Sequence, residues 1–245
     1  EKSDTVLDRQ AARLCDSTGY SEVSLTSLST SDHSRLEPLM DRMLSWTTDR
    51  KINLALPSLR ADNFSPTLME KLQAVRKSGL TFAPEAGSQR LRNTINKNVT
   101  EEEVLRTAKM AFQGGSTQMK LYFMLGLPTE ADEDVLAIIT LAQKVVDLFY
   151  SLPGRPKGKG VQVTISVACF VPKPFTPFQF EPQDTMEEFR RKQRLLLDTV
   201  TSKKIRVNYH DAATSRLEAV LARGDRRLCG AVEEVWRQGG NLEGW

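Results

Sequence analysis

The sequence predicts an α/β fold in which parallel strands alternate with helices in a partial, curved barrel. Short apolar runs that resemble strands begin near Glu22, Lys51, Leu80, Met119 and Val161. Their separation of roughly 30 to 40 residues is typical of strand–helix–strand units with a parallel sheet. A closed eight-stranded barrel takes about 250 residues and eight such units. Five units in this chain therefore predict an open barrel.

The central unit, Leu80–Glu130, carries the clearest local signals. Apolar runs at Leu80–Ala83 and Met119–Met124 are expected to be strands, and a helix lies between them. Thr100 and Glu103 have the spacing of a capping box, in which each side chain accepts from a free backbone N–H at the start of a helix. Gly114-Gly115 supplies a left-handed stop for the same helix.

The amino-terminal part begins with a helix that Ser3 or Asp4 is expected to cap. In a parallel α/β fold each helix follows a strand, so we expect a strand before Glu1 and a sequence that is a fragment of a longer protein. The other expected elements of this part are strands at Glu22–Leu25 and Ile52–Leu56 and helices at Leu36–Leu44 and Ser65–Gly79.

The carboxyl-terminal part is expected to continue the alternation and to end in an α-rich extension. We place the barrel at residues 1–204 and the extension at residues 205–245. A second capping box is expected at Thr185 and Glu188. The expected elements are a helix at Asp134–Leu152, a surface loop at Pro153–Gly160, a strand at Val161–Cys169, a helix after Thr185, a strand at Ile205–Tyr209, and helices at Ser215–Arg223 and Arg226–Arg237.

Composition excludes some classes of protein. The chain has 245 residues, 40% hydrophobic and 27% charged, with a formal net charge of +3. This small excess of positive charge does not indicate nucleic-acid binding. No apolar run approaches the ~20 residues of a membrane span, and no signal peptide opens the chain. We therefore expect a cytoplasmic protein without a membrane partner.

Polar residues collect where the predicted strands end. Because the carboxyl ends of parallel strands in βα barrels form one face, these residues predict a cleft typical of enzymes. Neither histidine has partners at the spacing of a metal motif, so no metal site is predicted within the chain. The polar residues at the strand ends are Ser27, Ser29, Asp32, Ser58, Arg60, Glu85, Ser88, Thr129, Glu130, Lys173, His210 and Asp211.

Five stretches give the chain a resemblance to a known family. They read SEVSLTSLSTSD, LALPSLRAD, PEAGSQRLRNTINKNVTEEE, YFMLGLPTE and FVPKPFTPFQ. In this order they resemble the strand-end loops of radical S-adenosylmethionine (radical SAM) enzymes of the methylthiotransferase-like branch, in a subfamily often fused to a cobalamin-binding-type domain. The resemblance implies a six-unit partial TIM barrel of which this chain holds units two to six and the helix of unit one.

The resemblance also implies a set of residues that bind S-adenosylmethionine. Ser27 and Ser29 would hold the methionine amino group, and Lys97, which stands where relatives usually have Arg, would pair with the methionine carboxylate. Glu85 and Ser88 would contact the ribose hydroxyls. Backbone at the next loop would lie against adenine. The cofactor-binding residues implied are Ser27, Ser29, Arg60, Glu85, Ser88, Lys97, Gly126, Leu127 and Pro128.

Each of these residues also has a simpler interpretation. Glu85 could pair with Arg90 or Arg92, and Lys97 could be a solvated lysine in a loop. The loop at Gly126–Pro128 could be only a tight turn.

The activity implied by the resemblance is reductive cleavage of S-adenosylmethionine to a 5′-deoxyadenosyl radical, on a substrate that the sequence does not identify. Such chemistry needs a 4Fe-4S cluster held by three close cysteines. Cys15, Cys169 and Cys229 are far apart, so the ligands are expected upstream of Glu1 and the fragment alone is expected to be inactive. Cobalamin is a further expected cofactor, through an upstream domain.

Two alternatives from other classes stay open. Lys120 lies on a predicted strand with Tyr122 on the same side, and a desolvated lysine can form a Schiff base, as in aldolase-like barrel enzymes. Lys120 is nearer the start of the strand than its end. Alternatively, the chain is an inert scaffold that presents the Pro-rich loop Pro172–Pro177 and its tail helices to other domains or a partner.

Overall fold

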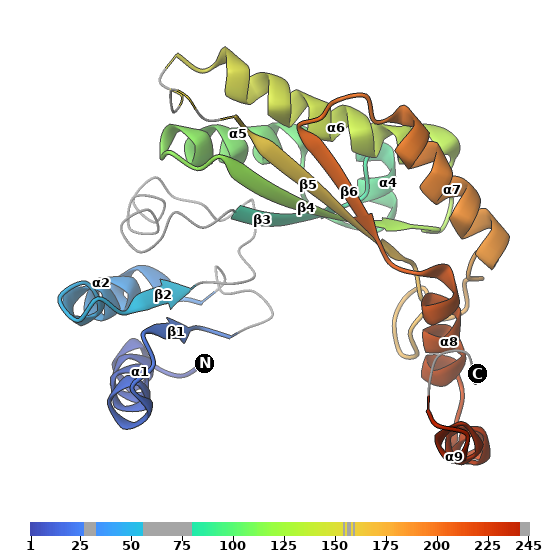
Figure 1. Cartoon of the computed structure of the whole chain (residues 1–245), viewed down its shortest axis with the longest axis horizontal. Coiled ribbons are helices and arrows are strands. Elements are labelled where there is room, and N and C mark those ends of the chain that lie inside the picture. The colour runs from blue at the N-terminus through green and yellow to red at the C-terminus, as the bar shows by residue number, and fades with distance from the viewer. Residues whose placement is uncertain (27–32, 56–79, 154, 156–157, 159, 241–245) are drawn as a thin grey trace.

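The structure is a computed structural model and describes residues 1–26, 33–55, 80–153, 155, 158 and 160–240. Helices and strands alternate along the described chain (Figure 1). In chain order the elements are α1 (Asp4–Thr18), β1 (Glu22–Ser24), α2 (Leu36–Thr47), β2 (Asn53–Ala55), β3 (Leu80–Glu85), α4 (Gln89–Thr94), α5 (Glu101–Gln113), β4 (Gln118–Leu125), α6 (Asp132–Ser151), β5 (Gln162–Cys169), α7 (Met186–Thr199), β6 (Ile205–Tyr209), α8 (Ala212–Arg223), the 3-10 turn η3 (Arg226–Leu228) and α9 (Cys229–Arg237).

All pairs of neighbouring strands are parallel, which confirms the predicted α/β organisation. β3, β4, β5 and β6 form one sheet in this order, and β1 pairs with β2 in a second sheet. Each strand predicted from the sequence is present, with ends that differ by a few residues. β6, with which the expected extension begins, is one of the two outer strands of the four-stranded sheet, opposite β3.

One continuous partial barrel is not confirmed. Within the described residues, hydrogen bonds join β1 to β2 and β3 to β6 in series, but not β2 to β3. The helix expected at residues 65–79 lies outside the described residues.

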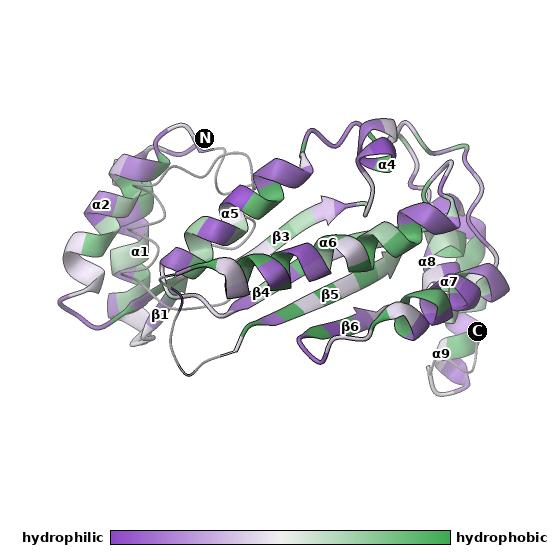
Figure 2. Ribbon diagram, turned by 90° about the horizontal axis from the view of Figure 1, so that it is seen from above, coloured by the Kyte–Doolittle hydropathy of each residue, from purple (hydrophilic) through white to green (hydrophobic). Residues whose placement is uncertain are grey.

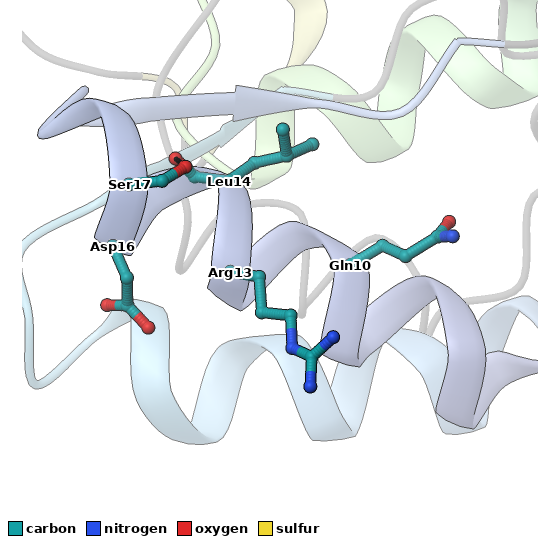
Figure 3. Close-up of a pocket in the computed structure, with 5 residues that line it drawn as sticks. All are labelled: Gln10, Arg13, Leu14, Asp16 and Ser17. Carbon is teal, nitrogen blue, oxygen red and sulfur yellow. Dashed lines mark hydrogen bonds between the residues drawn. The ribbon is translucent and has the colours of Figure 1, made fainter.

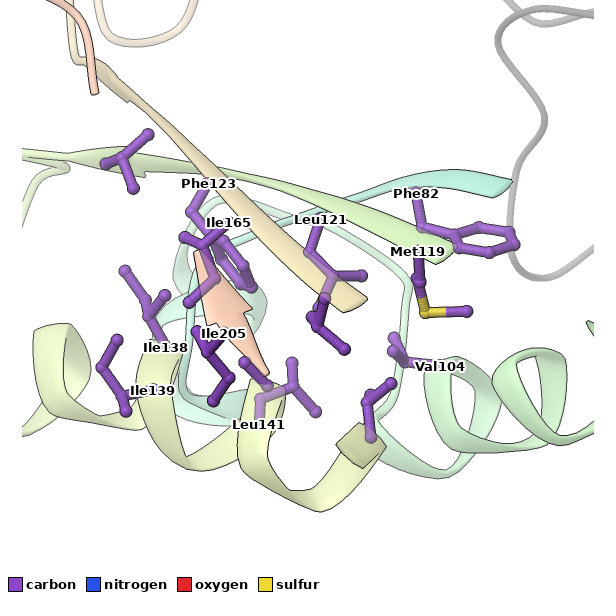
Figure 4. Packing of buried hydrophobic residues seen from close by; sticks show 14 of the residues in the cluster. Phe82, Val104, Met119, Leu121, Phe123, Ile138, Ile139, Leu141, Ile165 and Ile205 are labelled. Carbon is purple, nitrogen blue, oxygen red and sulfur yellow. The ribbon is translucent and has the colours of Figure 1, made fainter. Parts of the chain in front are cut away.

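One face of the four-stranded sheet is buried under helices. Figure 1 shows α5, α6 and α7 on one side of β4 and β5. Alternate residues of β4 are buried on that side, among them Met119, Leu121 and Phe123. Figure 4 shows Leu121 and Phe123 directed toward Ile138 and Leu141 of α6, and Met119 beside Val104 of α5. The resulting cluster is the main hydrophobic core, and it fixes the sheet against the helices that follow each strand.

The other face of the sheet is polar. Because successive side chains of a strand point to opposite faces, Lys120 and Tyr122 lie away from the core. The Nζ atom of Lys120 lies 4.6 Å from the ring centroid of Tyr122. This contact confirms that the two residues share a side. Lys120 is the third residue of β4 and so lies near the start of the strand.

The N-terminal helix caps agree fully with the sequence at two of the three places predicted within the described residues. Ser3 caps α1, and Thr100 forms the full capping box of α5. At α7 the Thr185 hydroxyl accepts from the Glu188 N–H. The second bond of the predicted capping box, from the Thr185 N–H to the Glu188 carboxylate, is not formed, so this part of the prediction is wrong. That carboxylate instead accepts from the guanidinium of Arg191, at 2.7 and 2.8 Å.

The two tail helices begin differently from the prediction. α8 starts at Ala212 and not near Ser215, because the Asp211 carboxylate accepts from the Thr214 N–H at 2.8 Å and caps the helix earlier. The last expected helix is divided into η3 and α9. Across the described ranges, no helix combines the length and apolarity that a membrane span requires.

Candidate functional site

The candidate site lies at the carboxyl ends of β3 and β4. The two strands are parallel and paired, so the loops that follow them emerge at the same edge of the sheet. We call residues 85–88 the β3 loop and residues 126–130 the β4 loop. In Figure 2 the arrowhead of β3 points toward α4, which starts where the β3 loop ends. Both loops contain residues that the sequence singled out.

Glu85 and Lys97 form an ion pair at the end of β3. The Nζ atom of Lys97 lies 3.4 Å from Oε1 of Glu85, and both side chains are about one-third exposed. The alternative pairing of Glu85 with Arg90 or Arg92 is wrong, because both arginines bind other groups. Glu85 has a φ of 69°, in the left-handed region that L-residues seldom adopt. An oppositely charged, half-buried pair at a strand end can bind both donor and acceptor groups of a polar ligand.

Ser88 has a structural task in addition to any ligand contact. Its Oγ accepts from the Leu91 N–H at 3.1 Å and so caps α4. The hydroxyl also donates to Oδ1 of Asp134. Since a hydroxyl has a single proton, a ligand at Ser88 could be bound only through a remaining lone pair.

Asp134 joins the β3 loop to the start of α6, directly after the β4 loop. Its buried carboxylate accepts from the Ser88 hydroxyl, from the Arg90 guanidinium and from the Ala131 N–H, the last at 2.8 Å. Burial by itself would raise the pKa of Asp134, but these three hydrogen bonds outweigh it and lower the pKa below its usual value. The carboxylate is therefore charged at neutral pH.

Gly87 brings the β3 loop into contact with the backbone of α6. A Cβ atom at this position would lie 2.3 Å from the backbone nitrogen of Ile138 and 2.6 Å from the backbone carbonyl oxygen of Asp134. Only glycine permits this approach. The close packing fixes the position of the β3 loop relative to the helix that follows the β4 loop.

Arg92 is a buried residue of this site that the sequence did not reveal. It is fully buried, and its guanidinium donates to the carbonyl oxygens of Ala86 and Gly87, both at 2.9 Å, and to Oε1 of Gln89 at 3.0 Å. Burial lowers the pKa of Arg92, although arginine stays charged. An arginine on a short polar helix ordinarily indicates an exposed side chain, so the sequence contained no signal for this role.

The β4 loop requires glycine at its first position. Gly126 has a φ of 80°, and a Cβ atom there would lie 2.7 Å from the ring of Phe189. Leu127 is buried with Ala86, Leu91 and Phe170 in a small apolar cluster. The side chain of Leu127 is therefore committed to packing, and the loop offers a ligand its backbone and the partly exposed ring of Pro128.

Lys192 and Glu130 form a buried ion pair beneath the β4 loop, which the sequence also did not reveal. Nζ of Lys192 lies 2.8 Å from Oε1 of Glu130 and 2.7 Å from Oδ2 of Asp184. Burial raises the pKa of Glu130, against the opposing effect of hydrogen bonds from Lys192 and Gly126. Burial lowers the pKa of Lys192, but the hydrogen bonds to Asp184 and Glu130 outweigh it, so this pKa is raised. From the sequence, a lysine in a charged helical segment is expected to be exposed. Only the tertiary contacts therefore reveal this ion pair.

Three predicted site residues, Ser27, Ser29 and Arg60, lie outside the described residues. The three cysteines are described and do not come together: Cys15 is buried on α1, Cys169 ends β5, and Cys229 is exposed on α9. Over the residues that the structure describes, no group of three His, Cys, Asp or Glu side chains could hold a metal ion.

A separate depression lies along α1, and the described residues that line it include no predicted site residue. Its volume is about 710 Å³, and Figure 3 shows Arg13, Leu14 and Asp16 among the residues that line it. These side chains come from consecutive turns of one helix. We do not assign the depression to the candidate site.

Comparison with known proteins agrees with the resemblance at the level of the superfamily. The family model described as the radical SAM superfamily matches residues 1–142. An uncharacterized protein of Methanocaldococcus jannaschii, MJ0966, is 34% identical over 186 residues, which are 76% of this chain and 38% of that protein. The chain thus spans little more than a third of the length of this curated relative.

The fold has a solved counterpart. The structure of archaeal Elp3 from Methanocaldococcus infernus with an N-terminal deletion (1–46) superimposes with a TM-score of 0.51 at 10% identity. The superposition covers 96% of this chain and 64% of that one. At this identity the similarity concerns the fold, in which parallel strands alternate with helices.

Proposed function

The chain belongs to the radical SAM superfamily, and on this premise we propose that the β3 and β4 loops bind S-adenosylmethionine for its reductive cleavage. The observation that carries the proposal is the pairing of two loops at one sheet edge, with the charged residues Glu85 and Lys97 half-buried beside them. When bound at a reduced 4Fe-4S cluster, S-adenosylmethionine supplies a 5′-deoxyadenosyl radical.

The charged pair fits the polar half of this cofactor. Lys97 carries a positive charge that can pair with the methionine carboxylate, although an ammonium lacks the two-point geometry of arginine. Glu85 can accept hydrogen bonds from ribose hydroxyls. Ser88 retains a lone pair for the same purpose. Because Glu85 and Lys97 contact each other at 3.4 Å, binding exchanges part of that contact for contacts with the ligand.

The β4 loop fits the flat half of the cofactor. The Cβ direction of Gly126 is filled by the Phe189 ring, and Leu127 is turned into the apolar cluster, so the loop carries no side chain of its own toward a ligand before Pro128. Adenine could therefore lie against the backbone of Gly126–Pro128. For Ser27, Ser29 and Arg60 the proposal follows the sequence resemblance alone.

The residues present do not fit an iron–sulfur cluster, since the three cysteines lie on α1, β5 and α9. We place the cluster ligands in a segment before Glu1 of a longer protein, in which the two parallel sheets are parts of one partial barrel. The methylthiotransferase-like branch and a cobalamin-type domain belong to the same proposal.

Schiff-base chemistry at Lys120 is not favoured by these findings. Lys120 lies near the start of β4, away from the two loops, and its ammonium rests on the Tyr122 ring. The superfamily match adds no support for it.

Two preparations test the proposal: the 245-residue chain and a version extended upstream to include the proposed cysteines. We expect the extended protein to hold iron and sulfide in a ratio near one and to release 5′-deoxyadenosine from S-adenosylmethionine under reduction. We expect the 245-residue chain to hold no cluster. An upstream sequence without three close cysteines, or an extended protein that holds iron but leaves S-adenosylmethionine intact, would contradict the proposal.

A further inference from the structure

The group formed by Lys192, Glu130 and Asp184 joins α7 to the β4 loop. Lys192 contacts both carboxylates, and the side chains of Lys192 and Glu130 are 6% and 2% exposed. A buried ion pair is expensive to desolvate and by itself is weak evidence of stability. Because the pair lies directly against the β4 loop, its main consequence is the position of that loop.

Glu130 holds one peptide unit of the β4 loop. The carbonyl oxygen of Leu125 accepts from the Phe170 N–H at 2.8 Å, and the N–H of Gly126 donates to Oε1 of Glu130, also at 2.8 Å. The peptide between Leu125 and Gly126 is thus bound at both ends. The Glu130 N–H also donates to the Leu127 oxygen at 3.0 Å, which closes the loop.

Lys192 keeps Glu130 in this position. The same oxygen, Oε1 of Glu130, accepts from Gly126 and lies against Nζ of Lys192. Without the ammonium, the buried carboxylate would face the like charge of Asp184, and it would take up a proton or turn toward water. Either response weakens the bond to Gly126. Phe189, also on α7, fills the space beside Gly126. A side chain at position 126 would therefore clash with the Phe189 ring.

We infer that Lys192 is a positioning residue: through Glu130 it fixes the backbone at Gly126, and thereby the surface that the proposed function gives to adenine. The fixing of Gly126 is a property of the fold. The effect on S-adenosylmethionine rests on the proposed function.

The test compares four forms of the chain: wild type, Lys192→Met, the double variant Lys192→Met with Glu130→Gln, and Lys144→Met. Lys144 of α6 pairs with Glu101 of α5 at the surface, so Lys144→Met removes an exposed ion pair remote from the loop and is the control for loss of a lysine charge. Circular dichroism checks that each form is folded. Amide hydrogen exchange at Gly126 and calorimetric binding of S-adenosylmethionine are then measured.

We expect Lys192→Met to speed exchange of the Gly126 amide at least about tenfold and to weaken S-adenosylmethionine binding about tenfold, which corresponds to ~1.4 kcal/mol. The double variant should recover slow exchange, because the neutral amide that Glu130→Gln introduces can still accept from Gly126 and leaves no buried charge at this position. Lys144→Met should match wild type. This recovery separates positioning from a general loss of packing.

The outcomes are distinguishable. Equal exchange at Gly126 in wild type and Lys192→Met, or a double variant that exchanges as fast as Lys192→Met, overturns the inference. If the lysine variant is unfolded, the double variant alone decides, since it is compared directly with wild type. The proposed function is tested separately by the extended protein, so a failure there leaves the exchange result at Gly126 to decide the role of Lys192.

Discussion

The Lys97 ammonium lies 3.4 Å from the Glu85 carboxylate, where β3 ends, and neither group is fully buried. Partly exposed ion pairs contribute little to stability, about 0 to 1 kcal/mol. The pair is therefore better suited to a ligand than to holding the fold, and variants at these positions should separate binding from stability.

We predict that Lys97→Met weakens S-adenosylmethionine binding by about ten- to a hundredfold, since hydrogen bonds to charged groups contribute about 1.5 to 3 kcal/mol. The midpoint of thermal unfolding should change by little. Titration calorimetry and thermal circular dichroism measure the two effects. Lys109→Met, at an exposed position on α5, is the matched control and should bind as wild type does. Equal binding by the two variants would remove Lys97 from the site.

Gly87→Ala should be among the most damaging single-methyl changes in the chain. The added Cβ would meet the backbone of α6 at 2.3 Å, which neither element can relieve by a change of rotamer. Overpacking of this kind costs about 1 to 3 kcal/mol or more. Chemical denaturation measures the free energy of unfolding.

The control for Gly87 is Gly230→Ala on α9, where nothing lies within 4 Å of the new Cβ. In a helix this change is neutral or stabilising, by up to about 1 kcal/mol. Equal effects of the two substitutions would show that the contact between Gly87 and α6 is not present in solution.

Arg92→Met should destabilise the protein and loosen the β3 loop. The substitution keeps most of the side-chain volume but leaves the carbonyl oxygens of Ala86 and Gly87 without their buried donor. Each unsatisfied buried group costs about 1 to 3 kcal/mol. Denaturation should show this loss, whereas Arg106→Met, at an exposed ion pair on α5, should stay within about 0.5 kcal/mol of wild type. A stability for Arg92→Met equal to that of the control would refute the role of Arg92.

Asp134 should make the free energy of unfolding depend on pH in the acid range. Its pKa in the folded protein is below the usual value, because hydrogen bonds from Ser88, Ala131 and Arg90 outweigh the opposing effect of burial. The stabilisation is therefore complete above the pKa of the unfolded chain, near 3.8, and is lost as the pH falls through the folded pKa. We expect the stability difference between wild type and Asp134→Asn to be constant from about pH 7 to 5 and to shrink below about pH 4. A difference that grows in acid would contradict the assignment.

Much of the local structure could be predicted from the sequence. Alternation of apolar residues at Val161–Cys169 and the helical stripe before Gly114 are local patterns, and such periodicities depend only on neighbours in the chain. The capping box at Thr100 and Glu103 is local for the same reason. The parallel direction of the strands, and their order within each of the two sheets, then followed from the spacing of the units.

The sequence by itself thus determined all the described strands, most of the described helices and the parallel direction of the strands, but not the short helix α4. Only the tertiary structure decided how the polar residues at the strand ends are engaged. Ser88 donates to Asp134, 46 residues away, and Glu130 of the β4 loop pairs with Lys192 of α7. The physical reason is that burial and charge pairing depend on groups distant in sequence. An arginine or lysine that the sequence predicts to be exposed can therefore be buried and hydrogen-bonded inside a site.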